Sequence, residues 1–159
     1  MLRALNLSYN SIDEKFAKLL FPGLQSSHTL EILNINNNTI GNDELKSGEK
    51  FFSLNNSLLT LIFDHNLIGP IGGDCLFKYF KSNSYINIKS LDIGYNGLTR
   101  EDTELLVSFI TNNQNLITVN LGWNYFFDEG IEEICESLSQ KKIKNKKSYI
   151  IYWITILLK

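Results

Sequence analysis

The chain has 159 residues, of which 43% are hydrophobic and 20% are charged, a composition typical of one globular domain. Its net charge of −2 argues against a nucleic acid partner, because phosphate backbones attract strongly basic proteins. The charge is uneven, since residues 1–140 hold nine basic and seventeen acidic side chains, an excess of acids that favours basic partners.

Five segments of the chain follow one pattern of apolar and polar residues, L-x-x-L-x-L-x-x-N. Alternate residues of a β-strand point to the same side, so L-x-L predicts a short strand with its apolar side chains in the core. The final asparagines are 28, 28, 30 and 28 residues apart. Such a period predicts stacked structural repeats. We place five of them within residues 1–140, starting at Leu2, Leu30, Leu58, Ile88 and Leu116.

Each segment ends in an asparagine, where the chain is expected to turn away from the strand. An asparagine amide can form hydrogen bonds with backbone groups that such a bend leaves unpaired. Stacking would place the five side chains in a ladder, so we predict a structural role for Asn10, Asn38, Asn66, Asn96 and Asn124.

The residues between these segments predict helices. The first follows Asp13 and would bury Phe16, Leu19 and Leu20. The second follows Asn42 and is weakened by Gly48, because glycine disfavours helix interiors.

The third repeat is two residues longer than its neighbours, and its helical region opens with Gly-Pro-Ile-Gly-Gly at 69–73. We predict that its helix starts late, covers about 75–80 and lies slightly out of line. The fourth helix, over 99–110, opens with a capping-box pattern. The fifth, over 128–138, has acids in its first turn and apolar residues at helical spacing.

This 28-residue pattern, followed by an amphipathic helix, resembles the ribonuclease-inhibitor-like class of leucine-rich repeats. Residues 124–130 and 38–44 are similar to the N-x-I-x-D-E-G signature of that class. The resemblance covers residues 1 to about 140. It implies an α/β fold, a right-handed horseshoe-shaped solenoid with parallel strands on its concave face and helices on its convex face. It also implies a scaffold that binds another macromolecule through the concave face.

Both ends depart from the pattern. A solenoid usually carries capping segments, and none precedes the first predicted strand. A lysine-rich stretch at 144–147 stands where a sixth strand is expected. We therefore expect a fragment, a truncated gene model or one arc of a longer repeat protein.

The C-terminal segment, residues 141–159, is basic and then apolar. Its ten-residue apolar stretch, 149–158, would span about 15 Å as a helix, too short to cross a bilayer. Three interpretations stay open: a last strand or helix that covers the end of the arc, non-native sequence from a reading-frame or splice error, or a membrane-surface anchor.

Catalytic and metal-binding patterns are weak. His28 and His65 belong to different repeats, which predicts neither a catalytic triad nor a metal cluster. Gly72-Gly73 lacks the lysine and spacing of a phosphate-binding loop. We therefore predict that the protein is not an enzyme and uses no metal or other cofactor.

The expected location is cytoplasmic. The N-terminus shows no secretory signal. Cys75 and Cys135 lie in predicted helices of different repeats, which fits reduced thiols better than a disulfide framework.

The remaining candidate for function is the outward face of the predicted strands, where equivalent positions stack about 4.8 Å apart. One column holds Asn6, Asn34, Ile62, Asp92 and Asn120; a second holds Ser8, Asn36, Asp64, Gly94 and Gly122; a third holds Tyr9, Asn37, His65, Tyr95 and Trp123. Aromatic residues gather in the third column. Tyrosine and tryptophan are enriched among binding hot spots, although these rings could instead cover backbone at the strand ends.

Our first hypothesis is a non-catalytic scaffold that binds a protein partner through this face. Trp123 and Tyr95 would be anchors, Asp92, Asp64 and Asn120 polar contacts, and His65 and Tyr9 further members of the surface. Two alternatives stay open: a regulator of a small GTPase, since the resembled class includes the Ran GTPase-activating protein, or a segment of a larger repeat receptor or scaffold.

Overall fold

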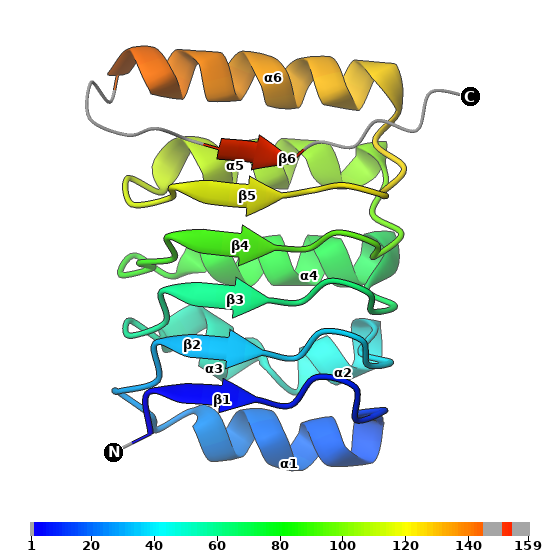
Figure 1. Ribbon diagram of the computed structural model, residues 1–159, viewed down its shortest axis with the longest axis vertical. Helices are drawn as coiled ribbons and strands as arrows, with labels where there is room; N and C mark the ends of the chain where they lie inside the picture. Colours follow the sequence, from blue (N-terminus) through cyan, green and yellow to red (C-terminus); the bar gives the residue numbers. More distant parts are fainter. Residues whose placement is uncertain (1, 145–150, 154–159) are drawn as a thin grey trace.

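The computed structural model of the chain describes residues 2–144 and 151–153. Six strands form one parallel sheet in chain order, as Figure 1 shows. They are β1 (Ala4–Asn6), β2 (Ile32–Asn34), β3 (Thr60–Ile62), β4 (Ser90–Asp92), β5 (Thr118–Asn120) and β6 (Ile151–Trp153).

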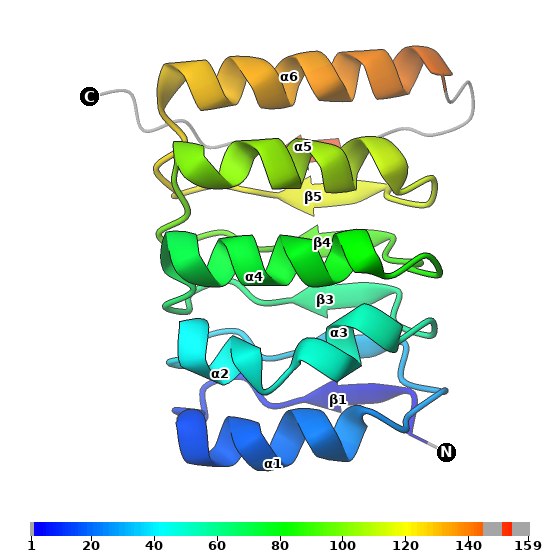
Figure 2. The same cartoon turned by 180° about the vertical axis from the view of Figure 1, so that it is seen from behind.

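The helices cover the other side of the sheet, as the view from behind in Figure 2 shows. They are α1 (Glu14–Leu24), α2 (Asn42–Lys46), α3 (Glu49–Leu54), α4 (Gly69–Ser82), the 3₁₀-helix η1 (Arg100–Asp102), α5 (Thr103–Asn112) and α6 (Phe127–Lys144). The predicted α/β repeat solenoid is confirmed, with all five predicted strands in place.

The core runs without a break through the repeats. Equivalent strand residues pair directly, so that Leu33 lies between Leu5 and Leu61. Phenylalanine rings connect the helical layers, and the Phe52 ring lies 5.3 Å from that of Phe21 and 6.1 Å from that of Phe80. Each repeat therefore buries its apolar face against its neighbours, as expected of a solenoid.

The first helix has a different buried face from the predicted one. Ala17, Phe21 and Leu24 are buried; of the three predicted residues, Leu20 packs partly buried against the core, whereas Phe16 and Leu19 are exposed. The predicted face was wrong because α1 packs against α2 and α3 on one side only, and its opposite side has no neighbour among the described residues. The predicted weakness at Gly48 is confirmed, since α2 ends before it and α3 begins after it.

The third repeat also differs from its prediction. Its helix α4 starts early, at Gly69, and Pro70 occupies the first turn, where proline is favourable because no N–H is needed there. The two additional residues lie after the helix instead. Asn83 follows Asn66 by 17 residues, as in the neighbouring repeats, but Ile88 follows Asn83 by five residues rather than the three that separate Asn55 from Leu58.

A second set of asparagines, which the sequence interpretation missed, directly follows the helices α3, α4 and α5. The Asn83 amide donates hydrogen bonds to the carbonyl oxygens of Phe52 and Asn55, at 3.1 and 2.7 Å. Asn55 donates in turn to the Ser27 carbonyl at 3.1 Å. These side chains join successive repeats where each helix leads back to a strand; the third member of the set is Asn113.

Asp102 carries the capping contact predicted for the fourth helical segment. Its Oδ2 accepts a hydrogen bond from the Thr99 N–H at 2.8 Å. The side chain is buried, and its Oδ1 has no hydrogen-bond partner among the described residues. Burial raises the pKa of Asp102 to about 6, although the Thr99 N–H opposes this effect.

We expect Asp102 to lower the stability of the protein as the pH rises from about 4 to 6. The folded state holds the Asp102 proton more tightly than the unfolded chain, where an aspartate has a pKa of about 3.9, so the free energy of unfolding falls over this range. Asp102→Asn removes the titration, so its effect on the free energy of unfolding should be more favourable near pH 8 than near pH 4, by about 2 kcal/mol. Urea unfolding of both proteins measures this difference; equal differences at both pH values would contradict the prediction.

At the C-terminal end, the last helix is longer than predicted and a sixth strand follows it. α6 continues to Lys144, since lysine is a good helix former, and Ile151 then pairs with Thr118 in β5. The sixth strand thus begins 33 residues after the fifth, where earlier strands follow at 28 or 30. The remaining tail, 145–150 and 154–159, lies outside the described residues. No helix among the described residues is long and apolar enough to cross a membrane.

Candidate functional site

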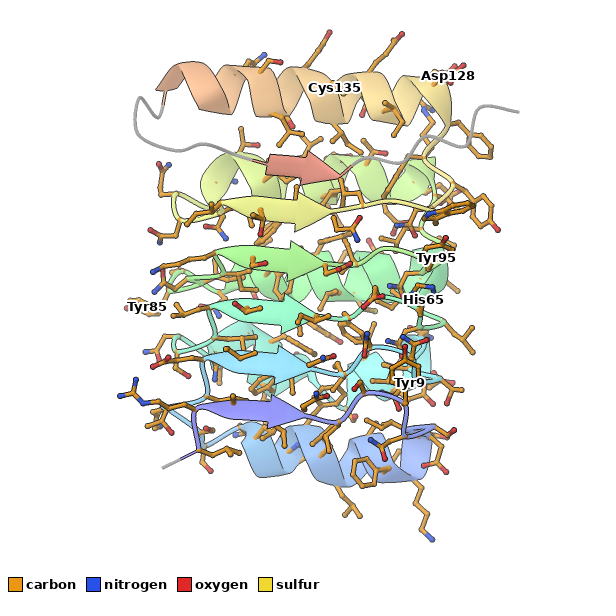
Figure 3. The ribbon with its side chains drawn as sticks, in the orientation of Figure 1. Tyr9, His65, Tyr85, Tyr95, Asp128 and Cys135 are labelled. Carbon is orange, nitrogen blue, oxygen red and sulfur yellow. The ribbon has the colours of Figure 1, made fainter. Side chains whose placement is uncertain are left out.

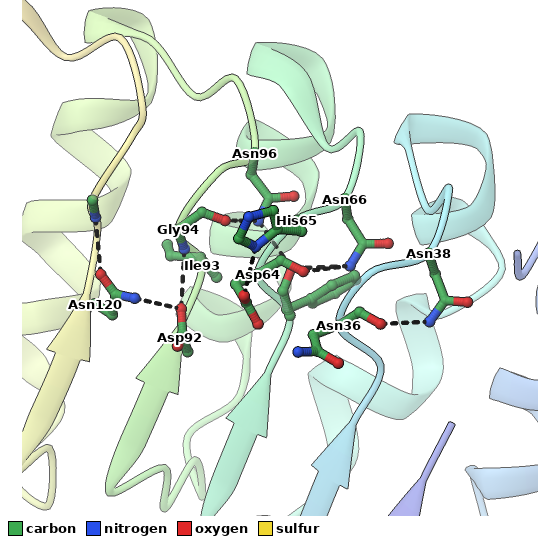
Figure 4. A network of polar contacts seen from close by, with 12 residues as sticks. Asn36, Asn38, Asp64, His65, Asn66, Asp92, Ile93, Gly94, Asn96 and Asn120 are labelled. Carbon is green, nitrogen blue, oxygen red and sulfur yellow. Dashed lines mark hydrogen bonds and ion pairs between the residues drawn. The ribbon is translucent and has the colours of Figure 1, made fainter. Parts of the chain in front are cut away.

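The asparagines that end the strand segments hold the chain where it turns toward the helices. Asn38 makes the fullest set of contacts: its Oδ1 accepts from the Asn10 and Ile12 N–H groups, both at 3.0 Å. Its amide donates to carbonyl oxygens of Leu7 and of Ile35. Figure 4 shows this series side by side in neighbouring repeats, and the same pattern recurs at Asn66 and Asn124.

The series is weaker at two of its members. Asn10 is exposed, and its side chain donates only to the Ser8 carbonyl at 2.9 Å. Asn96 is buried, but its Oδ1 has no hydrogen-bond partner in the described part of the chain. Instead, the Gly69 N–H of the preceding repeat donates to the Asn96 main-chain carbonyl at 2.8 Å, because α4 begins at Gly69.

The third predicted column lies directly before these asparagines, and all of its members have a left-handed backbone. Their φ angles lie between 50 and 60°, in Tyr9, Asn37, His65, Tyr95 and Trp123. Asparagine tolerates this conformation, but bulky side chains do so at a cost of about 1 kcal/mol each. The turn therefore fixes where each side chain points, and four of the five repeats place a ring there.

Three of these rings form a continuous stack, which we name the aromatic column: His65, Tyr95 and Trp123. The ring centroids of His65 and Tyr95 are 4.0 Å apart, and those of Tyr95 and Trp123 are 4.8 Å apart. The interplanar angles are 18 and 17°, close to parallel. Tyr95 and Trp123 nevertheless remain 39% and 41% exposed. The column is therefore an ordered, partly open aromatic surface at the carboxyl ends of the strands (Figure 3).

Acidic and amide groups border the column. The Asp64 carboxylate lies 2.7 Å from Nδ1 of His65, which holds the imidazole in place. Asp92 Oδ1 accepts from the Asn120 amide at 2.9 Å and from the Gly94 N–H at 3.2 Å. Burial raises the pKa of Asp92, and its hydrogen bonds with Gly94 and Asn120 act in the opposite direction.

Asp92 and Asn120 also have a local structural task. Asn120 Oδ1 accepts from the Gly122 N–H at 3.0 Å, as Asp92 does from Gly94, so each side chain closes a turn at the end of its strand. Asn6 and Asn34 make the same contact in the first two repeats. Part of the hydrogen-bonding capacity of these candidate polar contacts is thus already used within the chain.

Tyr9 is the predicted surface residue that the structure keeps apart. It occupies the same repeat position as the column, but Asn37 separates it from His65 and its ring is 76% exposed. Figure 3 shows Tyr9 below the column at the first repeat. The structure therefore brings together His65, Tyr95 and Trp123 and leaves Tyr9 as an isolated ring.

Sequence reasoning missed two further aromatic residues after β5, one on the loop and the other at the first position of α6. Tyr125 and Phe127 are 56% and 68% exposed. The Tyr125 N–H donates to the Leu98 carbonyl at 2.6 Å, which fixes the loop against the fourth repeat. Comparison of the repeats could have found both residues, because the other four carry no ring at these positions.

No group of three or more potential metal ligands occurs among the residues that the structure describes. Cys75 and Cys135 are both free thiols. The geometry on the strand face, with stacked rings beside hydrogen-bonded acids and amides, suits noncovalent recognition.

Known proteins share the repeat pattern of this chain. A leucine rich repeat family model matches residues 26–44 and 112–135. NACHT, LRR and PYD domains-containing protein 3 of Bos taurus is 28% identical over 141 residues, which is 88% of this chain and 14% of that protein. The chain thus spans a small part of the length of this relative.

Two solved structures share the fold. The C-terminal domain of Caenorhabditis elegans tropomodulin has a TM-score of 0.72 and 16% identity, over 90% of this chain and 86% of that one. Leiomodin-1 actin-binding site 2 has a TM-score of 0.70 and 13% identity, over 91% and 83%. Together with the five repeats and their parallel strands, these matches show that the chain has a leucine-rich repeat fold, with repeats similar to those of the ribonuclease-inhibitor-like class.

Proposed function

We propose that the protein is a non-catalytic scaffold that binds a protein partner through its strand face, with Tyr95 and Trp123 as anchors. The observation that carries this proposal is the aromatic column, whose rings are held in parallel by their left-handed backbone and remain about two-fifths exposed. Rigid, partly exposed aromatic rings provide contact area at a low entropic cost, since their conformation is set before binding.

The polar border supports the same function. The Asp64 and Asp92 carboxylates lie beside the rings, and both are held by internal hydrogen bonds. Fixed acids of this kind orient a partner and raise its association rate more than they add affinity. We further propose a cytoplasmic location, which the two free thiols favour because reducing compartments keep cysteines unpaired.

The double variant Tyr95→Ala/Trp123→Ala tests the proposal. In affinity capture followed by mass spectrometry, we expect the amount of bound partner to fall about tenfold or more relative to the wild-type chain. Hot-spot residues carry most of the binding energy of an interface. Its free energy of unfolding should fall by only about 1 kcal/mol, the value of the lost ring stacking.

Tyr9→Ala is the matched control, since Tyr9 has the same repeat position and the same left-handed backbone but no ring neighbour in the column. It should capture the same proteins as the wild type. If the double variant and the control lose the same partners equally, or if the double variant unfolds, the rings are not a specific binding surface.

A further inference from the structure

Aromatic residues occupy three alternating positions from the loop after β5 to the first residue of α6, and we name them the aromatic rim: Trp123, Tyr125 and Phe127. Trp123 belongs to the aromatic column as well, so the rim continues the column from the strand face around the carboxyl ends of the strands. The residues equivalent to Tyr125 and Phe127 in the other repeats are Ser11 and Asp13, Thr39 and Gly41, Leu67 and Gly69, and Gly97 and Thr99. An aromatic rim is therefore specific to the fifth repeat.

Phe127 combines an unfavourable backbone conformation with an apolar side chain exposed to solvent. Its φ angle is 54°, a left-handed conformation that is rare for a bulky residue, and its ring is 68% exposed. The equivalent Asp13, Gly41 and Thr99 have φ angles of −97, −123 and −122°, and only a glycine, Gly69, shares the left-handed form, with φ of 60°. Strained residues gather at binding sites, and here the strain presents an apolar ring to solvent.

The charges near the rim are mainly acidic, and the basic residue beside it, Arg100, pairs with acids of α6. The outward positions of β1–β5 and of the turns that follow them contain Asp64 and Asp92 but no lysine or arginine. The first turn of α6 adds Asp128 and Glu129. Glu129 pairs with Arg100 at 3.0 Å, whereas Asp128 makes no ion pair within the described part of the chain. Figure 3 shows Asp128 at the same end of the strands as His65 and Tyr95.

We propose that the aromatic rim and column bind a protein segment that presents arginine side chains between apolar ones. This inference rests on the proposed function and adds the chemistry of the partner. A planar guanidinium stacks on tyrosine and tryptophan rings and pairs with carboxylates at the same time. Apolar side chains between the arginines cover Phe127 and Tyr125. A segment rich in acids is repelled by Asp64, Asp92 and Asp128.

The rim variant Tyr125→Thr/Phe127→Gly tests this inference, since it carries the second repeat's own residues at these positions. Glycine also removes the backbone strain at Phe127, so the fold is expected to keep its thermal midpoint. Tyr85→Ser is the matched control, because Tyr85 is also an exposed aromatic residue but lies at the opposite end of the strands (Figure 3).

Random peptides displayed on phage are selected on the full-length wild-type chain, and the recovered sequences are synthesised and titrated by fluorescence polarisation. We expect the peptides to be enriched in arginine and depleted in aspartate and glutamate. Their affinity should fall about tenfold on the rim variant and stay unchanged on Tyr85→Ser. Arginine→lysine in the peptide should weaken binding, and arginine→glutamate should abolish it.

Other outcomes separate this inference from the proposed function. Peptides without an excess of arginine, or peptides that bind the rim variant as well as the wild type, overturn the inference. If those same peptides still lose affinity for Tyr95→Ala/Trp123→Ala, the proposed function stands. Peptides whose affinity is unchanged by either set of substitutions contradict both the inference and the proposed function. Should the rim variant lose its fold, the single variant Phe127→Gly gives the same comparison.

Discussion

Replacing Asn38 with alanine should lower the free energy of unfolding by about 3 kcal/mol, since it leaves several buried backbone groups without partners. The side chain accepts from the N–H groups of Asn10 and Ile12 and donates to three carbonyl oxygens from two repeats. Alanine can replace none of these contacts, and water reaches this site poorly because Asn38 is buried. Equilibrium urea unfolding followed by circular dichroism measures the change.

Asn10→Ala is the control for this prediction, because Asn10 has the same repeat position but an exposed side chain with one hydrogen bond to the Ser8 carbonyl. Its substitution should cost less than about 1 kcal/mol. A similar loss for both variants would show that the asparagine side chains do not hold the repeats together.

Gly73→Ala should destabilise the protein by about 2–3 kcal/mol, although alanine is the better helix former. A Cβ atom at this position would lie 2.3 Å from Oδ1 of Asp102 and 2.6 Å from Cδ2 of Leu98. Both neighbours are buried and cannot swing into solvent. The two repeats must therefore separate, or Asp102 must lose its hydrogen bond with the Thr99 N–H. The shift in the urea midpoint measures this effect.

Gly23→Ala provides the opposite case within the same chain. Gly23 lies in α1, and a Cβ atom there meets no atom within 4 Å. This variant should be more stable by about 0.5 kcal/mol, because alanine loses less conformational entropy than glycine in a helix. If Gly73→Ala were also stabilising, close packing between α4 and η1 would not be the reason for glycine at that position.

The regular part of this protein was readable from its sequence. The L-x-x-L-x-L-x-x-N pattern located every strand from β1 to β5, because alternation within a strand and a nearly constant repeat length can both be seen in the sequence. The acids before α1 and in the first turn of α6 likewise marked the helix starts. Even the second asparagine set, Asn55, Asn83 and Asn113, was within reach, since it shares the same spacing.

Errors arose where two interpretations of the same residues were possible. The Gly-Pro-Ile-Gly-Gly opening predicts a late helix start, yet proline suits the first turn of α4 and the two additional residues lie beyond Asn83. Phe16 and Leu19 were assigned to the core of α1, but a helix with one packed side leaves such residues in solvent. Apolar spacing alone does not say which side of a helix has a neighbour.

The sequence by itself determined the repeat, the class of fold and the position of the ring-bearing column. Only the tertiary structure decided which of those rings form a surface, because stacking depends on what the neighbouring repeats place beside each ring. Asn37 interrupts the series after Tyr9, whereas His65, Tyr95 and Trp123 lie in consecutive repeats and stack within 5 Å. The left-handed backbone of Phe127 likewise arises from the path by which the chain enters α6, which no spacing of residues records.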